Sequence, residues 1–147
     1  MLIATLSGVV LVSSLYIYIM YFFTFNDIDK EYTQTGPGPV ISPTGEYTAN
    51  AYYEPYGGAA GGVNVWVEIT KHNDEDEQKT IYYSDVNNNF KIEWVDKDTL
   101  FIINESSEYP ELNKSIKLDV EREIYHDRGL ACQSWLMKDE YETCYQK

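Results

Sequence analysis

Residues 46–70 read EYTANAYYEPYGGAAGGVNVWVEIT, and this stretch decides the expected fold. Apolar side chains recur at every second position in both of its halves: Tyr47, Ala49, Ala51 and Tyr53, then Val63, Val65, Val67 and Ile69. Because successive side chains of a β-strand point to opposite faces, a period of two indicates strands with one apolar face. The stretch therefore predicts two strands joined by the glycine-rich segment 57–62.

Four further segments are short, rich in β-branched and aromatic residues, and separated by turn-forming clusters: residues 80–85, 90–95, 99–104 and 115–125. Parallel neighbours need a long crossover, and no helical period of suitable length lies between these strands. The sequence thus predicts a mainly β protein with a small antiparallel β-sheet domain, either blade-like or a meander. The C-terminal residues fit a short helix or a disulfide-closed hairpin, and the cysteine argument below favours the hairpin.

The N-terminal residues 1–26, MLIATLSGVVLVSSLYIYIMYFFTFN, carry no Asp, Glu, Lys, Arg or His. Coiled as a helix, residues 2–25 would span roughly 36 Å, which exceeds the hydrocarbon core of a bilayer at about 30 Å. Aromatic residues crowd the C-terminal end of this run, where an aromatic belt would lie in the interface. The length of the run and the absence of a basic leader or a small-x-small cleavage motif favour an uncleaved signal anchor over a signal peptide.

We expect three parts: a transmembrane signal anchor over residues 1–26, a polar tether over residues 27–38, and an extracytoplasmic antiparallel β domain over residues 39–147. No Lys or Arg precedes the anchor, so the positive-inside rule acts only through the α-amino group. A short N-terminus before a long C-terminal domain favours the N-terminus inside. The expected location is the cell membrane, crossed once, with the domain outside.

The charge is strongly acidic, with 24 Asp and Glu against 11 Lys and Arg, a formal net charge of −13. All charged side chains lie from Asp27 onward, so the domain carries the whole of this charge. Proteins that bind nucleic acids neutralise phosphates with Lys and Arg, and an acidic domain is unsuited to that. The charge therefore argues against a nucleic-acid partner, and also against lying flat on an anionic lipid surface.

The two cysteines, Cys132 and Cys144, lie close together near the C-terminus. In an oxidising compartment such a pair normally forms a disulfide, and two separate buried thiols are the alternative. A straight helix would part the two Cα atoms by about 18 Å, whereas a disulfide tolerates less than about 7 Å. If the bridge forms, the segment CQSWLMKDEYETC must double back, with residues 138–142 as the expected turn.

The glycine-rich segment is the main candidate site. A phosphate-binding loop needs Lys and Ser or Thr at the start of a helix, but Val63 and Asn64 follow here and begin a strand. We therefore expect no nucleotide and no cofactor. The segment is either a flexible connection or a pliable recognition tip. In the second case, the candidate interaction loop comprises Tyr53, Tyr56, Gly57, Gly58, Gly61, Gly62 and Trp66.

A calcium loop is the only metal site worth testing. Asp85, Asn87 and Asn89 occupy the first, third and fifth positions of such a loop, and Asp96 the twelfth. Phe90 stands where the loop requires glycine, and the residues after it read as a strand. An Asn-rich turn is the better interpretation, and no metal ligand is predicted.

No catalytic constellation is recognisable either. The sequence contains no G-x-S-x-G, no H-E-x-x-H and no paired C-x-x-C. His126 is followed by Asp127, but no nucleophile is tied to it by spacing, so we expect a surface or hydrogen-bonding histidine. The sequence predicts no enzyme.

The order of several segments resembles an uncharacterised family, a domain of unknown function, found in small membrane-anchored proteins of Gram-positive spore-forming bacteria. These segments follow the apolar N-terminus as SPTGEYTANAYYEPYGGAAGGVNVWVEI, KTIYYSD, IEWVDKDTLFI and EIYHDRGLAC. The resemblance covers nearly the whole chain. It implies a membrane anchor but no activity and no catalytic residue.

Two functional hypotheses follow. The chain has 14 Tyr and 3 Trp, more than a core of this size should bury, and such residues are enriched where surfaces recognise partners. The first hypothesis is a non-catalytic interaction module for another protein or an envelope component. The alternative is an enzyme or accessory factor acting on cell-wall polymers, with aromatic side chains stacking on sugars and two carboxylates in acid–base roles.

Overall fold

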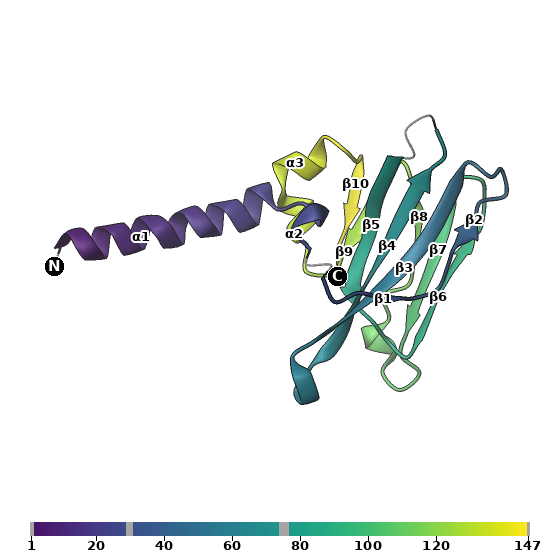
Figure 1. Ribbon diagram of the computed structural model, residues 1–147, viewed down its shortest axis with the longest axis horizontal. Helices are drawn as coiled ribbons and strands as arrows, with labels where there is room; N and C mark the ends of the chain where they lie inside the picture. The colour runs from purple at the N-terminus through teal and green to yellow at the C-terminus, as the bar shows by residue number, and fades with distance from the viewer. Residues whose placement is uncertain (1, 29–30, 74–76, 147) are drawn as a thin grey trace.

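The computed structural model describes residues 2–28, 31–73 and 77–146. Figure 1 shows two parts of different shape, a long N-terminal helix that projects outward and a body of two β-sheets. The helix α1 (Leu2–Ile17) continues as the π-helix η1 (Tyr18–Phe22). The segment Thr5–Phe22 is long and apolar enough to cross a membrane. A short 3-10 turn, η2 (Phe25–Asp27), follows it.

The larger sheet has the strand order β1-β3-β4-β5-β9-β10, and β2 also pairs with β3. These strands are β1 (Gln34–Thr35), β2 (Val40–Ile41), β3 (Tyr47–Tyr56), β4 (Gly62–Lys71), β5 (Glu77–Asp85), β9 (Glu123–His126) and β10 (Thr143–Tyr145). The smaller sheet has the order β6-β7-β8, with β6 (Asn89–Trp94), β7 (Thr99–Glu105) and β8 (Ile116–Asp119). Short helices complete the body: η3 (Gly58–Ala60), η4 (Pro110–Leu112), α2 (Leu130–Gln133) and α3 (Trp135–Lys138).

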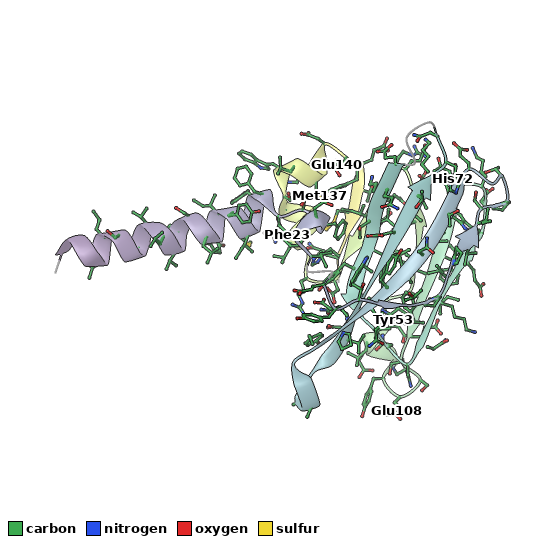
Figure 2. All side chains as sticks on the ribbon, viewed as in Figure 1. Phe23, Tyr53, His72, Glu108, Met137 and Glu140 are labelled. Atoms are coloured by element: carbon green, nitrogen blue, oxygen red, sulfur yellow. A yellow bond between two sulfur atoms is a disulfide. The ribbon has the colours of Figure 1, made fainter. Side chains whose placement is uncertain are left out.

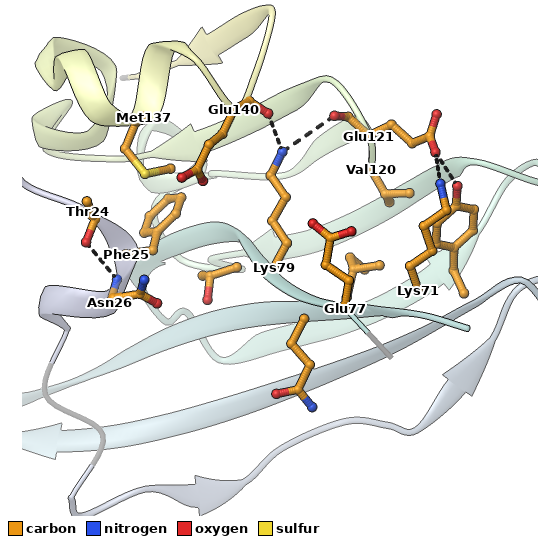
Figure 3. Close-up of a pocket in the computed structure, with 14 residues that line it drawn as sticks. Thr24, Phe25, Asn26, Lys71, Glu77, Lys79, Val120, Glu121, Met137 and Glu140 are labelled. Atoms are coloured by element: carbon orange, nitrogen blue, oxygen red, sulfur yellow. Dashed lines mark hydrogen bonds and ion pairs between the residues drawn. The ribbon is translucent and has the colours of Figure 1, made fainter. Parts of the chain in front are cut away.

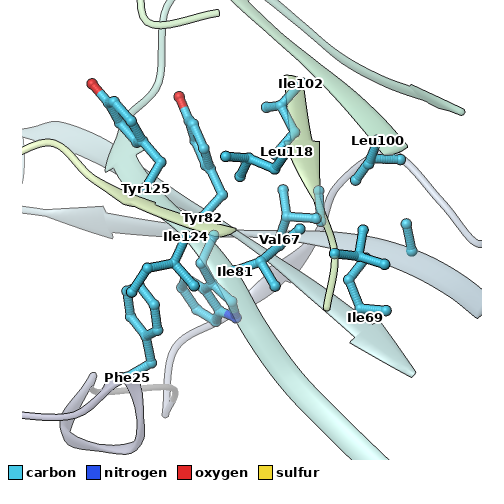
Figure 4. Packing of buried hydrophobic residues seen from close by; sticks show 14 of the residues in the cluster. Phe25, Val67, Ile69, Ile81, Tyr82, Leu100, Ile102, Leu118, Ile124 and Tyr125 are labelled. Atoms are coloured by element: carbon cyan, nitrogen blue, oxygen red, sulfur yellow. The ribbon is translucent and has the colours of Figure 1, made fainter. Parts of the chain in front are cut away.

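The hydrophobic core lies between the two sheets (Figure 4). Alternate side chains of β4, among them Val67 and Ile69, are buried together with side chains of the smaller sheet, among them Leu100, Ile102 and Leu118. The period-two pattern thus places one face of each strand inward, as expected for two packed sheets. The apolar area removed from water stabilises the body by about 25 cal/mol per Å².

The mainly β class and the N-terminal apolar helix are confirmed, while the strand pairing is mixed rather than wholly antiparallel. β9 pairs in parallel with β5 and with β10. A parallel neighbour requires a crossover, and the strands β6, β7 and β8 of the smaller sheet supply it here. The sequence offered no helical crossover, and a crossover made of strands has no comparable signature.

The predicted strand 115–125 is divided into β8 and β9 by a turn. Arg122 N donates to Asp119 O at 3.2 Å, and Glu121 N donates to Asp119 Oδ1 at 3.0 Å. The Asp119 side chain thereby closes a local turn, as Asp does where it competes with a continuing strand. The turn sends the chain from the smaller sheet into the larger one.

The predicted tether, residues 27–38, lies against the body where the structure describes it. Gly36 N donates to Ala51 O, and Ala51 N donates to Pro37 O, so this segment continues the sheet beside β3. Phe25 and Ile28, on either side of the predicted start of the tether, are buried in the core. The helix is therefore joined to the domain by packed side chains.

The C-terminal cap, residues 130–145, contains the predicted disulfide between Cys132 and Cys144, whose Cα atoms are 5.2 Å apart. The chain doubles back as expected, but through α2, α3 and a turn rather than as a hairpin. Glu142 N and Thr143 N both donate to Arg122 O, which starts the pairing of β10 with β9. The returning strand thus finds its partner in β9, because β9 offers a free edge.

Candidate functional site

A groove of about 510 Å³ runs along one edge of β5 (Figure 3). Its floor is the N-terminal half of β5. Its walls are residues 24–26, which follow the N-terminal helical stretch, together with Met137 and Glu140 of the cap and the Val120–Glu121 turn. We call it the edge groove. It joins elements that are far apart in the sequence, which is why no sequence motif indicated it.

The groove exists because β5 is paired unequally on its two sides. On one side, β4 pairs with β5 from Glu77 to Asp85. On its other side, β9 pairs with it only at Tyr82 and Tyr83. The N-terminal half of β5 therefore has one open edge. Open strand edges present unpaired N–H and C=O groups that another strand can use.

The register identifies which backbone groups face the groove. His72 N donates to Glu46 O, and this hydrogen bond continues the β3–β4 ladder. Because the direction alternates along a strand, even-numbered residues of β4 direct their backbone groups to β3, and odd-numbered residues direct theirs to β5. Ile69 lies opposite Lys79, whose backbone therefore faces β4. The N–H and C=O groups of Gln78 and Thr80 face the opposite way. Within the residues that the structure describes, they pair with no neighbouring strand.

Lys79 crosses the groove. Its ammonium donates to Glu140 O at 2.7 Å and to Glu121 O at 3.5 Å, so it links the floor to both walls (Figure 3). Burial lowers the pKa of Lys79.

A three-residue cluster closes the far end of the groove. Tyr47 Oη and Lys71 Nζ both donate to Glu121 Oε1, each at 2.6 Å. The hydrogen bonds from Lys71 and Tyr47 lower the pKa of Glu121, and burial together with Glu121 raises the pKa of Tyr47 to about 12. Glu121 is therefore a carboxylate and Tyr47 a neutral phenol at neutral pH. This arrangement fastens the 119–122 turn to β3 and β4.

The glycine-rich segment forms the end of a long hairpin, with Tyr56 opposite Gly62 as the last pair of β3 and β4. We call residues 56–62 the hairpin tip. Gly57 and Gly58 have φ values of 75° and 62°, a region that favours glycine. A Cβ on Gly61 would lie 1.5 Å from Tyr56 O, so this position also requires glycine. The tip is therefore a defined turn whose backbone conformation requires glycine at these positions.

The residues of the predicted interaction loop are only partly brought together. Tyr56 and the four glycines lie at the tip, around a shallow hollow. Trp66 is 1% exposed and stacks on Tyr52, so it contributes no contact area. Tyr53 is half-buried and meets Phe90 edge-on, with ring centroids 5.9 Å apart. The sequence placed these two side chains at the tip because strand alternation does not tell which face a second layer covers.

His126 is buried where helix and domain meet, which the sequence did not indicate. Its ring lies within 6 Å of the rings of Phe23, Phe25 and Tyr83, at centroid distances of 5.6, 5.9 and 5.1 Å. Its Nδ1 accepts a hydrogen bond from Arg128 N. Burial lowers the pKa of His126 to about 4. The expected hydrogen-bonding role is present, and the expected alternative of a surface position is wrong.

The residues of the hypothetical calcium loop have other roles in the structure, as hydrogen-bonding groups or as part of a strand. Asp85 Oδ1 accepts from Tyr56 Oη at 3.0 Å, and Asn87 N donates to Asn104 Oδ1 at 2.8 Å. Asn89 lies in β6, as its strand pattern predicts. In the described parts of the chain, no three His, Cys, Asp or Glu side chains gather as metal ligands.

The family of unknown function DUF5412 matches residues 1–128. No curated protein matches the chain, and no solved structure matches it either. The matched region includes the helix, the hairpin tip and the β5 floor of the groove, and it ends before the C-terminal cap.

Proposed function

The chain belongs to this family, and we propose that it is a membrane-anchored extracytoplasmic interaction module without catalytic activity. Support for the anchor comes from the apolar helix, and support for the outer side of the membrane comes from the disulfide, since such bonds persist in oxidising compartments. The partner is a protein rather than a nucleic acid or a nucleotide, given the charge of −13 and the strand that follows the glycine-rich tip.

The partner's recognition segment is an extended polypeptide that adds a strand to β5. One observation carries this proposal: the backbone groups of Gln78 and Thr80 face a groove and pair with no neighbouring strand in the described chain. Strand addition uses such groups for affinity and side-chain pockets for specificity. The groove supplies an apolar contact at Met137 and charged ones at Lys71 and Glu77.

The position of the groove restricts which segments can reach it. Residues 24–26, directly after the helical stretch, form one of its walls. A bound strand would therefore lie close to the membrane surface. The segments best placed to bind are extended stretches next to the membrane in another anchored protein.

The test uses a proline that removes one groove-facing N–H. Proline is tolerated at a strand edge when its missing N–H faces away from the sheet, so Gln78→Pro should fold. A photoreactive amino acid at the exposed position Glu77 should form a defined adduct in intact cells. Gln78→Pro should abolish this adduct, and Gln78→Ala, which keeps the N–H, should retain it.

The controls separate loss of binding from loss of folding. The same photoreactive residue at Lys117, on the exposed side of β8, should give no such adduct. The melting temperature of Gln78→Pro should lie close to that of Gln78→Ala. An adduct that persists in a folded Gln78→Pro protein would refute strand addition at this edge.

The alternative, an enzyme or accessory factor for cell-wall polymers, has one observation in its favour. Three carboxyl groups line the groove, those of Glu77, Glu121 and Glu140. A glycosidase needs one carboxyl group that is protonated near neutral pH, whereas the pKa of Glu121 is lowered. Release of soluble sugars from purified cell wall, abolished by Glu77→Gln or Glu140→Gln, would favour this alternative over the interaction module.

A further inference from the structure

Trp135, the first residue of α3, differs from the other two tryptophans in its exposure. Trp66 is 1% exposed and Trp94 is half-buried, whereas Trp135 is 61% exposed. The next residue, Leu136, is 49% exposed. Two large apolar side chains in succession on the surface of an acidic domain indicate contact with something other than water.

The surroundings of Trp135 connect it to the end of the apolar helix. Its ring meets Tyr21 and Phe22 edge-on, with centroid distances of 5.8 and 6.2 Å. Both are themselves partly exposed and belong to η1, the last turns of the helical stretch. Figure 1 shows α3 beside this end of the helix. The four side chains Tyr21, Phe22, Trp135 and Leu136 form what we call the aromatic collar.

The length of the helix sets the level of the collar. At 1.5 Å per residue, residues 2–22 extend over about 31 Å, close to the hydrocarbon thickness of about 30 Å. If the helix spans the bilayer, Tyr21 and Phe22 lie at its boundary, and Trp135 lies at the same level because it touches both. This boundary is where Trp and Tyr are enriched in membrane proteins.

The collar cannot easily change its height relative to the helix. The disulfide between Cys132 and Cys144 closes the cap, and Met137, which lies on α3 with Trp135, is buried. Below the collar, Phe25 is buried in the domain core (Figure 2 shows Phe23 and Met137 at this junction). The cap and the foot of the helix are therefore parts of one packed unit.

We propose that the aromatic collar docks the domain on the lipid bilayer that its own helix crosses, with Trp135 and Leu136 inserted between headgroups and acyl chains. The occupant is lipid because the collar continues the apolar surface of the helix without a break. The inference rests on the proposed membrane anchor. Docking fixes the domain against the membrane, with the edge groove at a constant height above it. The collar side chains are apolar or aromatic, and a domain with a net charge of −13 is not attracted to anionic lipid, so docking does not require such lipid.

The experiment uses the full chain in phosphatidylcholine vesicles with bromine at defined depths on the acyl chains. Fluorescence of Trp135 is the signal, obtained as the difference between the wild-type protein and Trp135→Phe. We expect strong quenching, greater for bromine near the headgroup than for bromine near the bilayer centre. Replacing a third of the lipid by phosphatidylglycerol should leave the quenching unchanged.

A matched pair of variants on α3 tests the geometry. Leu136→Asp should at least halve the quenching of Trp135, whereas Lys138→Asp, on the same short helix, should leave it unchanged. Both variants should keep the disulfide and the wild-type melting temperature within a few degrees. Quenching that is the same in both would show that Leu136 is not inserted and would overturn the collar.

The outcomes distinguish this inference from the proposed function. If the chain resists extraction with alkaline carbonate but Trp135 emits as a water-exposed indole without quenching, the anchor holds and the collar is refuted. If carbonate removes the chain, the anchor and the collar both fail. Quenching that appears only with anionic lipid would also contradict an apolar docking surface.

Discussion

The hairpin tip and the C-terminal cap occupy different parts of the described domain and differ in how they are made. The tip is built from consecutive residues, with glycines at the positions where a side chain would strain or clash. The cap is built from distant ones, since β10 pairs with β9, and Trp135 touches Tyr21. The tip extends away from the body, whereas the cap lies where the helix meets the domain (Figure 1). The cap also forms one wall of the edge groove.

This difference separates conspicuous sequence from functional position. The glycine-rich run draws attention, but its glycines are explained by the backbone of one turn. The cap carries no motif beyond two cysteines, yet it supplies a wall of the edge groove and half of the aromatic collar. If this is correct, damage to the cap and its junction should destabilise the whole domain, and damage to the tip should have smaller, local effects.

The largest effect is expected from removing the disulfide. The bridge joins residues 12 apart in sequence, and closing a loop of that size contributes about 3 kcal/mol. Replacing Cys132 and Cys144 by serine should lower the free energy of unfolding by about this amount, measured by denaturant titration. Reductant should destabilise the wild-type protein equally and leave the double variant unchanged. A double variant as stable as the wild type would contradict a structural role for the cap.

The second effect concerns pH at the helix–domain junction. The pKa of His126 falls from 6.5 to about 4 on folding, so the neutral form is favoured in the native state. The stability from this preference is complete above pH 6.5 and is lost progressively as the pH falls towards 4. At pH 5 the loss should be about 2 kcal/mol, since one unit of pKa shift corresponds to 1.36 kcal/mol.

The pH effect is measured as a difference because carboxyl groups titrate in the same range. His126→Phe should remove the part of the pH dependence between 6.5 and 4 that His126 causes. His72→Gln should retain the full dependence, since His72 lies on the surface next to Thr48. Equal slopes in the wild type and His126→Phe would show that folding does not lower the pKa of His126.

How far the sequence could predict this structure depends on the range of the contacts. Period-two alternation predicted β3 and β4 correctly because it reports on neighbours along one strand. It could not tell that Trp66 faces a covered surface, nor that β9 would leave one edge of the N-terminal half of β5 without a partner strand. The edge groove depends on that missing pairing, and the burial of His126 depends on Phe23, far away in the sequence. Such contacts leave no periodic signal.

The third effect is expected at the hairpin tip and compares two glycines. A Cβ on Gly61 would overlap Tyr56 O, so Gly61→Ala must open the last pair of the hairpin and should cost about 2 kcal/mol. At Gly58 no atom lies within 4 Å of a Cβ, and only the φ of 62° opposes alanine, which should cost about 1 kcal/mol. The melting temperature should therefore fall further in Gly61→Ala than in the alanine variant of Gly58. Equal, near-zero effects would mean that the tip is a flexible connection.

The smallest effect should come from the hydrogen bond that holds the tip to the body. Tyr56 Oη donates to Asp85 Oδ1 at 3.0 Å, and this bond raises the pKa of Tyr56. Because the pair is solvent-exposed, Tyr56→Phe should lower the free energy of unfolding by only about 0.5 kcal/mol. Hydrogen exchange should nevertheless quicken at residues 56–62 while β5 stays unchanged. The photoreactive adduct at Glu77 should persist, because the tip takes no part in the edge groove. Loss of the adduct in a stably folded Tyr56→Phe protein would return recognition to the tip and contradict the difference between the two regions.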